Sequence, residues 1–164
     1  MKKARFLIAY GLVLSAYPIL SGAEPTSSSL IRDENARPGA LDWQLTRVRP
    51  DGGGFRSPWI EGYCSKQSVL AGETLDIMVS TDPPAKFHIE IFRTGYYGGR
   101  GARLMTTLGP FQGTAQPVPP VGDKRLRECR WTPSTTLTIP AEWLSGVYLG
   151  RLTTLPEAAD QPYW

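Results

Sequence analysis

The stretch ETLDIMVSTDPPAKFHIEIFR (Glu73–Arg93) decides the fold, because it holds two alternating segments joined by a turn. In both segments every second residue is apolar and can face a core: Leu75, Ile77, Val79, then Phe87, Ile89, Ile91. A period of two is typical of β-strands that bury one face. The linking TDPPAK is a turn, since its adjacent prolines fit neither a helix interior nor a central strand.

Further strands are predicted on both sides of this unit. They are ARLMTTL (102–108), STTLTIP (134–140) and VYLGRLTTL (147–155), while PAEWLSG (140–146) predicts one short helical turn and QPVPPVGDK (116–124) a loop or sheet edge. Short strands at close spacing, without a long amphipathic helix, favour an all-β chain. We expect an immunoglobulin-like antiparallel β-sandwich over residues 60–164.

EWLSGVYLGRL (142–152) resembles the start of strand F in such sandwiches, where a tyrosine turns its hydroxyl back onto the backbone. Tyr148 is predicted to be that residue. Antibody domains carry a cysteine two residues later, and here that position is Gly150. A bridge between Cys64 and Cys129 would therefore not be the usual one between strands B and F. A disulfide and two free thiols both stay open.

The chain after Leu155 is predicted to be a turn and the first four residues of a return strand. A sandwich needs that strand to cover the edge of strand F, because an open edge invites aggregation. We therefore expect the last strand to be incomplete and the chain to be cut short in mid-fold.

Residues 1–23 are predicted to be a secretory signal peptide. MKKAR is followed by an apolar run of fifteen residues, and then by LSGA, which favours cleavage after Ala23. A membrane anchor is the alternative, but a spanning helix needs about twenty apolar residues and Pro18 interrupts this run. We expect an exported protein, periplasmic or extracellular, with no membrane association after cleavage.

The remaining chain is electrically neutral. The leader carries three of the 18 basic residues and none of the 15 acidic ones, so 15 of each remain. Nucleic-acid binding needs a clustered positive face, and we expect no such partner. Residues 24–59 are polar and rich in Pro, Gly and Ser, which predicts a flexible extension. Trp43, Phe55 and Trp59 could pin it to the sandwich.

RTGYYGGRGARLM (Arg93–Met105) invites a phosphate-binding interpretation that fails. It lacks the GxxxxGK[ST] pattern, the third glycine of GxGxxG, and a following helix. A tight turn between two strands, with glycines at positive φ, fits better. Tyr96 and Tyr97 would then pack against the sandwich or a neighbouring domain. The single histidine, His88, shares a polar strand face with Glu90 and is predicted to be a surface residue. HExxH, CxxC and GxSxG motifs do not occur in the sequence.

Two runs carry a family resemblance. EIFRTGYYGGRGAR (90–103) and IPAEWLSGVYL (139–149), with SPWIEGYCSKQSVLAGETLDIMVST and LRECRW, resemble the N-terminal β-sandwich region of N,N-dimethylformamidase large (beta) subunit-like proteins, over roughly residues 42–164. The motif residues, which are candidates for docking, are Tyr96, Tyr97, Gly98, Gly99, Arg103, Trp143 and Tyr148.

The resemblance implies an iron-dependent amidohydrolase acting on linear amides, with iron held by Tyr and Glu side chains in a larger downstream domain. It places no catalytic, cofactor or metal residue in this sequence. We therefore expect a non-catalytic domain that packs on or orients the missing catalytic domain or a partner subunit. The alternative is a free-standing extracellular module that binds carbohydrate or protein, motivated by five Trp and seven Tyr residues. The third hypothesis is that this chain is itself an enzyme.

Overall fold

The computed structural model describes residues 26–44, 56–57 and 59–155, and each strand predicted between residues 73 and 155 is present. The order of elements is α1 (Ser27–Asn35), β1 (Ile60–Cys64), β2 (Thr74–Thr81), β3 (Lys86–Thr94), the 3₁₀ turn η1 (Tyr97–Gly99), β4 (Ala102–Gln112), the 3₁₀ turn η2 (Asp123–Arg125), β5 (Thr135–Thr138) and β6 (Tyr148–Leu155).

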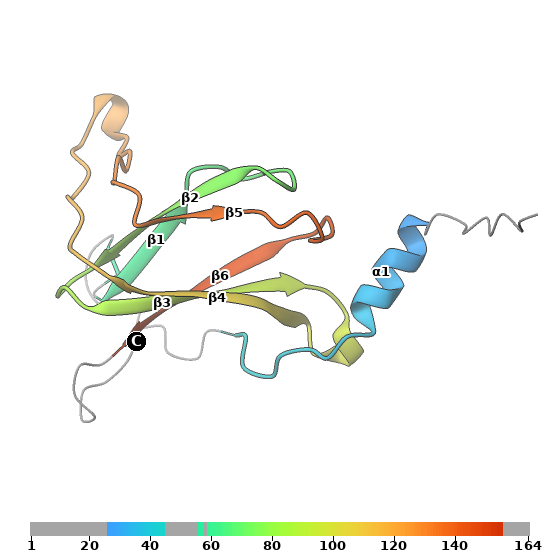
Figure 1. Cartoon of the computed structure of the whole chain (residues 1–164). Helices are drawn as coiled ribbons and strands as arrows, with labels where there is room; N and C mark the ends of the chain where they lie inside the picture. Colours follow the sequence, from blue (N-terminus) through green and yellow to red (C-terminus); the bar gives the residue numbers. More distant parts are fainter. Residues whose placement is uncertain (1–25, 45–55, 58, 156–164) are drawn as a thin grey trace, which may run out of the picture.

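The strands form two three-stranded antiparallel sheets that face each other as two layers (Figure 1). One sheet has the order β1-β2-β5 and the other β4-β3-β6. The chain crosses from one sheet to the other at the turn between β2 and β3, which contains Pro83 and Pro84. This arrangement confirms the predicted immunoglobulin-like sandwich.

The core lies between the layers and consists of the residues that the alternation predicted. Ile77, Val79, Phe87, Ile89 and Ile91 are each at most 6% exposed. Burying a side chain of this size contributes about 1.5–3 kcal/mol. The partly buried residues packed around them come from β1, β4, β5, β6 and the turn before β6: Ile60, Leu108, Phe111, Leu137, Trp143, Tyr148 and Leu152.

Strand β2 differs from the prediction because its second face is also covered. Met78 and Ser80, expected to face solvent, are 6% and 2% exposed. The connection between β4 and β5 returns over this face, and the Trp131 ring packs 5.4 Å from that of Tyr63, the neighbour of Met78 in β1. Arg56 donates to Ser80 Oγ at 3.0 Å. Strand alternation indicates which face of a strand points toward the core. It cannot show whether a long loop covers the opposite face.

The tyrosine predicted to begin strand F behaves as expected. Tyr148 begins β6, and its hydroxyl donates to the carbonyl of Leu144 at 2.6 Å. The preceding PAEWLSG forms hydrogen-bonded turns instead of the predicted helical turn, with Trp143 N–H donating to Pro140 O at 3.1 Å. The Trp143 ring stacks on that of Tyr148, with centroids 5.0 Å apart.

The extension expected to be flexible contains a helix that the sequence analysis did not predict. α1 begins after Thr26, whose Oγ1 accepts a hydrogen bond from the N–H of Ser29, and it ends three residues before Pro38. The helix leaves the end of the sandwich near η1, and the chain then runs back along the β4-β3-β6 sheet (Figure 1). The serine-rich composition suggested a loop because serine has a weak helix propensity. The N-cap and the tertiary contact of Glu34 stabilise the helix by more than this propensity costs.

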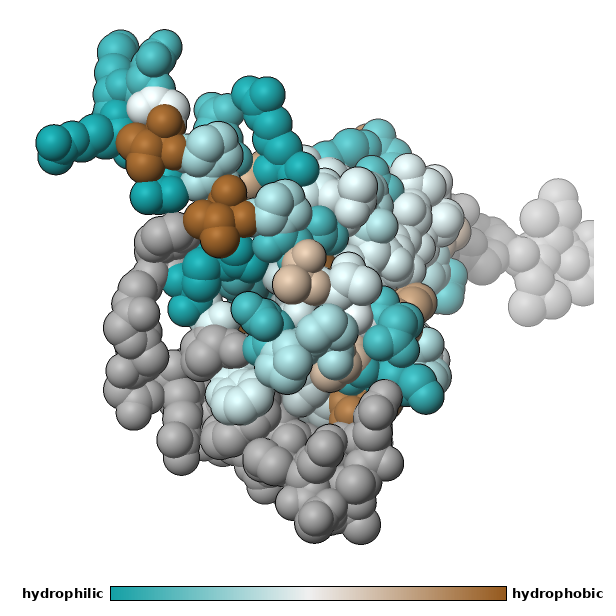
Figure 2. Space-filling view, turned by 90° about the vertical axis from the view of Figure 1, so that its left-hand side faces the viewer, coloured by the Kyte–Doolittle hydropathy of each residue, from teal (hydrophilic) through white to brown (hydrophobic). Residues whose placement is uncertain are grey.

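Several predictions fall outside the described residues. These are the signal peptide, Phe55, and the incomplete last strand after Leu155. In the part of the chain that the structure describes, no helix has the length and apolar character needed to cross a membrane. Figure 2 views the end of the sandwich opposite α1, where hydrophobic residues form separate spots on a mainly hydrophilic surface.

Candidate functional site

The turn between β3 and β4 is a strand–turn–strand corner, as predicted. β3 ends at Thr94, η1 follows, and β4 begins at Ala102. Gly98 and Gly99 adopt φ of 65° and 85°, values at which glycine is not strained. Tyr97 also has a positive φ of 43°, which a bulky residue rarely adopts, so its surroundings must hold it there.

The two adjacent tyrosines have opposite environments. Tyr97 is 2% exposed and lies inside the domain, whereas Tyr96 is 70% exposed. The ring of Tyr96 is therefore accessible to a docking partner, whereas the ring of Tyr97 packs inside the domain. The positive φ of Tyr97 turns the backbone between the two rings.

Tyr97 belongs to a buried polar cluster that we call the Glu34 cluster: Glu34, Arg93, Tyr97 and Arg103. Glu34 Oε1 accepts hydrogen bonds from Tyr97 Oη at 2.9 Å and from Arg103 Nε at 2.8 Å. Tyr97 Oη in turn accepts from Arg93 at 3.0 Å. Arg93 and Arg103 are register partners in β3 and β4, so their positive charges lie side by side on one face.

Glu34 supplies the negative charge between these arginines. Glu34 is 5% exposed, and burial alone would raise the pKa of its carboxyl group. Hydrogen bonds from Arg103 and Tyr97, with the charges of Arg103 and Arg37, outweigh burial and hold the pKa below its usual value. Glu34 is therefore ionised at neutral pH and its Oε1 is fully engaged.

Arg93 keeps an excess of hydrogen-bonding capacity. It donates to Tyr97 Oη and to the carbonyl of Ser145 at 2.8 Å. Its Nε is the buried side-chain polar atom that finds no partner among the described residues. Burial tends to lower the pKa of Arg93, but the hydrogen bond that it donates to Tyr97 and nearby charges raise the pKa above its usual value.

The segment after α1 is fixed to this corner by several contacts. Asn35 Oδ1 accepts from the N–H of Tyr96 at 2.7 Å, and Ala40 N–H donates to Ala102 O at 2.9 Å. Trp43 Nε1 donates to the carbonyl of Arg100 at 2.8 Å, which confirms that Trp43 pins the extension. At Gly39 a Cβ would lie 2.5 Å from the Cβ of Arg100, so the two backbones approach closely.

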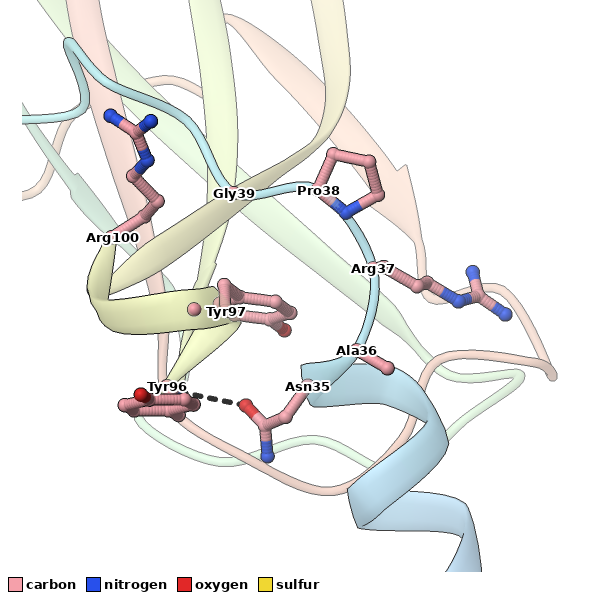
Figure 3. Close-up of a pocket in the computed structure, with 9 residues that line it drawn as sticks. Asn35, Ala36, Arg37, Pro38, Gly39, Tyr96, Tyr97 and Arg100 are labelled. Atoms are coloured by element: carbon pink, nitrogen blue, oxygen red, sulfur yellow. Dashed lines mark hydrogen bonds between the residues drawn. The ribbon is translucent and has the colours of Figure 1, made fainter.

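An open groove of about 490 Å³ lies between this segment and η1 (Figure 3). We call it the Tyr96 groove. Arg37 and Arg100 lie on opposite sides of Tyr97, and Tyr96 lies beside Asn35. Its lining residues are Asn35, Ala36, Arg37, Pro38, Gly39, Tyr96, Tyr97, Gly98 and Arg100.

The iron that the resemblance implies does not fit the Glu34 cluster. A tyrosine and a glutamate do meet here, but their oxygens bond to Arg93 and Arg103, and a cation would face those guanidinium groups. Within the described residues, no group of three or more His, Cys, Asp or Glu side chains is placed to hold a metal ion. The arrangement can position chain segments and attract anions.

The remaining sequence-predicted residues lie elsewhere. Trp143 and Tyr148 stack at the edge of the core and do not line the groove. Cys64 and Cys129 are free thiols in this structure and lie at the surface, and partial desolvation raises the pKa of the Cys64 thiol. His88 lies on the same face as Glu90, as predicted, with 3.4 Å between Nε2 and Oε2.

Sequence reasoning missed the contribution of α1. Glu34 and Arg103 are 69 positions apart, and their pairing leaves no local pattern. The available signal for the helix was Thr26 as an N-cap, followed by Leu30 and Ile31 and then by Pro38. Nothing in that signal would have indicated which carboxylate turns toward the sandwich.

Comparison with known proteins relates part of the sandwich to a protein family. Residues 88–162 match the family model described as N,N-dimethylformamidase beta subunit-like, C-terminal. Over these residues the chain is similar to this family. No curated protein and no solved structure matches the chain significantly.

The match runs from β3 past the end of β6, so it contains the motifs at 90–103, 126–131 and 139–149, whereas the motif at 57–81 precedes it. α1, β1 and β2 precede it. The description refers to the C-terminal part of the family proteins, whereas the motifs were interpreted as an N-terminal sandwich. The match confirms the family without placing this segment at the N-terminal end.

Proposed function

We propose that this β-sandwich is a non-catalytic docking domain of an N,N-dimethylformamidase beta subunit-like protein. It packs through the Tyr96 groove on a larger amidohydrolase-like domain and helps to orient it. The supporting observation is Tyr96, whose ring is 70% exposed although its backbone is fixed by Asn35. An exposed aromatic side chain on a rigid support is typical of a binding hot spot.

The Glu34 cluster explains how the support is kept rigid. Glu34 joins the end of α1 to β3, η1 and β4 by the hydrogen bonds described above, all within a largely buried site. A group of ion pairs and hydrogen bonds that is nearly complete fixes the conformation of the elements it joins. Tyr96 therefore loses little conformational freedom when a partner covers it, which favours association.

The test of docking is binding between this chain and the amidohydrolase-like region of a dimethylformamidase beta subunit-like protein from the same source, made as a separate chain. Calorimetric titration should show binding that Tyr96→Ala weakens by about 2 kcal/mol, as for a typical hot-spot residue. Leu70→Ala is the matched control, because Leu70 is 73% exposed and lies outside the groove. Equal affinity of the Tyr96→Ala chain and the wild type would refute docking through Tyr96.

The non-catalytic part of the proposal has its own test. The purified chain, supplied with iron, should not hydrolyse formamide or N,N-dimethylformamide. Hydrolysis that survives removal of contaminating protein, and that is lost when a carboxylate of this chain is replaced, would overturn it.

Export is part of the same proposal and rests on the leader sequence. Expression of the full chain in a bacterial host should give a periplasmic or secreted product whose N-terminus is Glu24, measured by intact mass. A cytoplasmic product that keeps Met1 would contradict export.

The free-standing binding module receives less support. The aromatic residues that motivated it are largely used in packing where the structure describes them. Tyr97 and Trp131 are 2% and 8% exposed, and Trp143 stacks on Tyr148. Sugar binding would need exposed rings, and the described part of the chain offers Tyr96 and, in part, Trp59.

A further inference from the structure

We infer that the Tyr96 groove receives an acidic segment of its protein partner, with carboxylate side chains reaching Arg37 and Arg100. This inference rests on the proposed docking function and adds the chemistry of the partner. Three independent features of the groove point to a negatively charged occupant.

The first feature is the sequence charge around the turn. Between Glu90 and Asp123 the chain carries three arginines, at positions 93, 100 and 103, and no acidic residue. The chain after the leader is neutral as a whole, so this is a local concentration of positive charge. A local field of one sign attracts and orients partners of the opposite sign.

The second feature is the state of the two arginines that line the groove. Arg100 is exposed and its guanidinium forms no ion pair or hydrogen bond with any described residue. Arg37 is 61% exposed, and only its Nε approaches Glu34 Oε2, at 3.4 Å. Arg37 is therefore paired through its Nε, Arg100 has no charged partner among the described residues, and both can form charge-assisted contacts with added carboxylates.

The third feature is the excess charge beneath the groove. The carboxylate of Glu34 bonds to Arg103, lies 3.4 Å from the Nε of Arg37, and is linked to Arg93 through the hydroxyl of Tyr97. The orphaned Nε of Arg93 shows that donors here exceed acceptors. Asp33 lies on α1 outside the groove lining, so no acidic residue of the lining competes for an incoming anion.

The geometry favours a segment over a single carboxylate. Arg37 and Arg100 lie on opposite sides of Tyr97, as Figure 3 shows, so one carboxylate cannot occupy both positions closely. A short extended segment with two or more acidic side chains could pair with both arginines. Gly98 and Gly99 leave room for it, since no atom of the chain lies within 4 Å of a Cβ built on either residue.

The test is an NMR titration of the ¹⁵N-labelled chain with a blocked tri-glutamate peptide. We expect saturable shifts of the Gly98, Gly99 and Arg100 amides that weaken as salt is added. The tri-glutamine peptide should give none. The double variant Arg37→Gln with Arg100→Gln should weaken binding by about tenfold or more, because both charge-assisted contacts are lost. Its spectrum elsewhere should stay unchanged, since glutamine keeps the Cβ and Cγ that pack near Gly39.

Lys86→Gln is the matched control, because Lys86 is exposed at the opposite end of β3 and the variant removes a positive charge there. It should bind tri-glutamate as the wild type does. Absence of saturable shifts, equal shifts with tri-glutamine, or equal loss in Lys86→Gln would each overturn the inference. Tighter binding of a short thymidine oligonucleotide than of tri-glutamate would also overturn it, because the groove would then select phosphate.

The two proposals can fail separately. If tri-glutamate does not bind but Tyr96→Ala still weakens association with the amidohydrolase-like region, the acidic segment is wrong and docking stands. If tri-glutamate binds in the groove but the amidohydrolase-like region does not, docking on that domain is wrong, and the acidic partner must be another protein.

Discussion

At the scale of single residues, Tyr148 and Tyr97 show what a local pattern can and cannot indicate. The role of Tyr148 was predictable because its hydroxyl bonds to a carbonyl only four residues upstream, within one recognisable turn. Tyr96 and Tyr97 are adjacent and of the same type, so the sequence could not show which one is buried. That depends on a backbone turn at positive φ and on Glu34, which is 63 positions away.

Tyr148→Phe should lower the free energy of unfolding by about 1 kcal/mol, since it removes one intramolecular hydrogen bond and leaves the ring in place. Urea denaturation followed by tryptophan fluorescence would measure it. Tyr96→Phe is the control, because the hydroxyl of an exposed ring should change stability by less than about 0.5 kcal/mol. If the two variants lose equal stability, the hydroxyl of Tyr148 has no special role.

Glu34→Gln should lower the free energy of unfolding at pH 7 by about 3 kcal/mol, because half-buried Arg103 loses its ion pair and buried Arg93 loses a nearby negative charge. Thermal and urea denaturation would detect the loss. Asp33→Gln, a change at the exposed neighbour on α1, should have little effect.

The pH dependence follows from the lowered pKa of Glu34. A carboxyl whose pKa is lower in the folded state stabilises the protein above its unfolded pKa, near 4.5. This contribution is lost as the pH falls through the folded value. Stability of the wild type should therefore decline more steeply below pH 4.5 than that of Glu34→Gln. Parallel pH profiles for the two proteins would exclude Glu34 as the source.

At the scale of elements, the strands were predictable and α1 was not. The strands carry period-two alternation over several residues, and each is bounded by Pro or Gly. α1 is polar and exposed over most of its length, and its tertiary contact is made by Glu34 and Asn35 near its end. A helix that is stabilised by such a contact leaves little periodicity to detect.

Gly95→Ala should loosen the extension without unfolding the sandwich. A Cβ there would lie 2.6 Å from Asn35 Oδ1 and 2.8 Å from Tyr97 Cε2, so both contacts must shift. We expect faster amide exchange at Ala36 and Ala40 and a stability loss of about 1–3 kcal/mol. Gly122→Ala is the control, because its Cβ would meet only Leu126 O, at 3.4 Å. Unchanged exchange in Gly95→Ala would show that the extension is held in another way.

At the scale of the whole molecule, two layers position one corner for recognition. The alternation and the β-turn predicted the layers, and the family match over residues 88–162 agrees with the motifs that suggested it. The groove could not be predicted, because it forms between η1 and a segment that the sequence analysis expected to be flexible. Its arginines are distant in the sequence and are brought together by the fold.

The central claim is that the corner formed by η1 and the segment after α1 is the docking surface. The most direct measurement is hydrogen–deuterium exchange of the chain, alone and with the amidohydrolase-like region added. The account predicts slower exchange at residues 35–39 and 96–101, with little change in the turn between β2 and β3 at the other end. Protection confined to the β2–β3 turn or to the β4–β5 connection, with none around Tyr96, would contradict it.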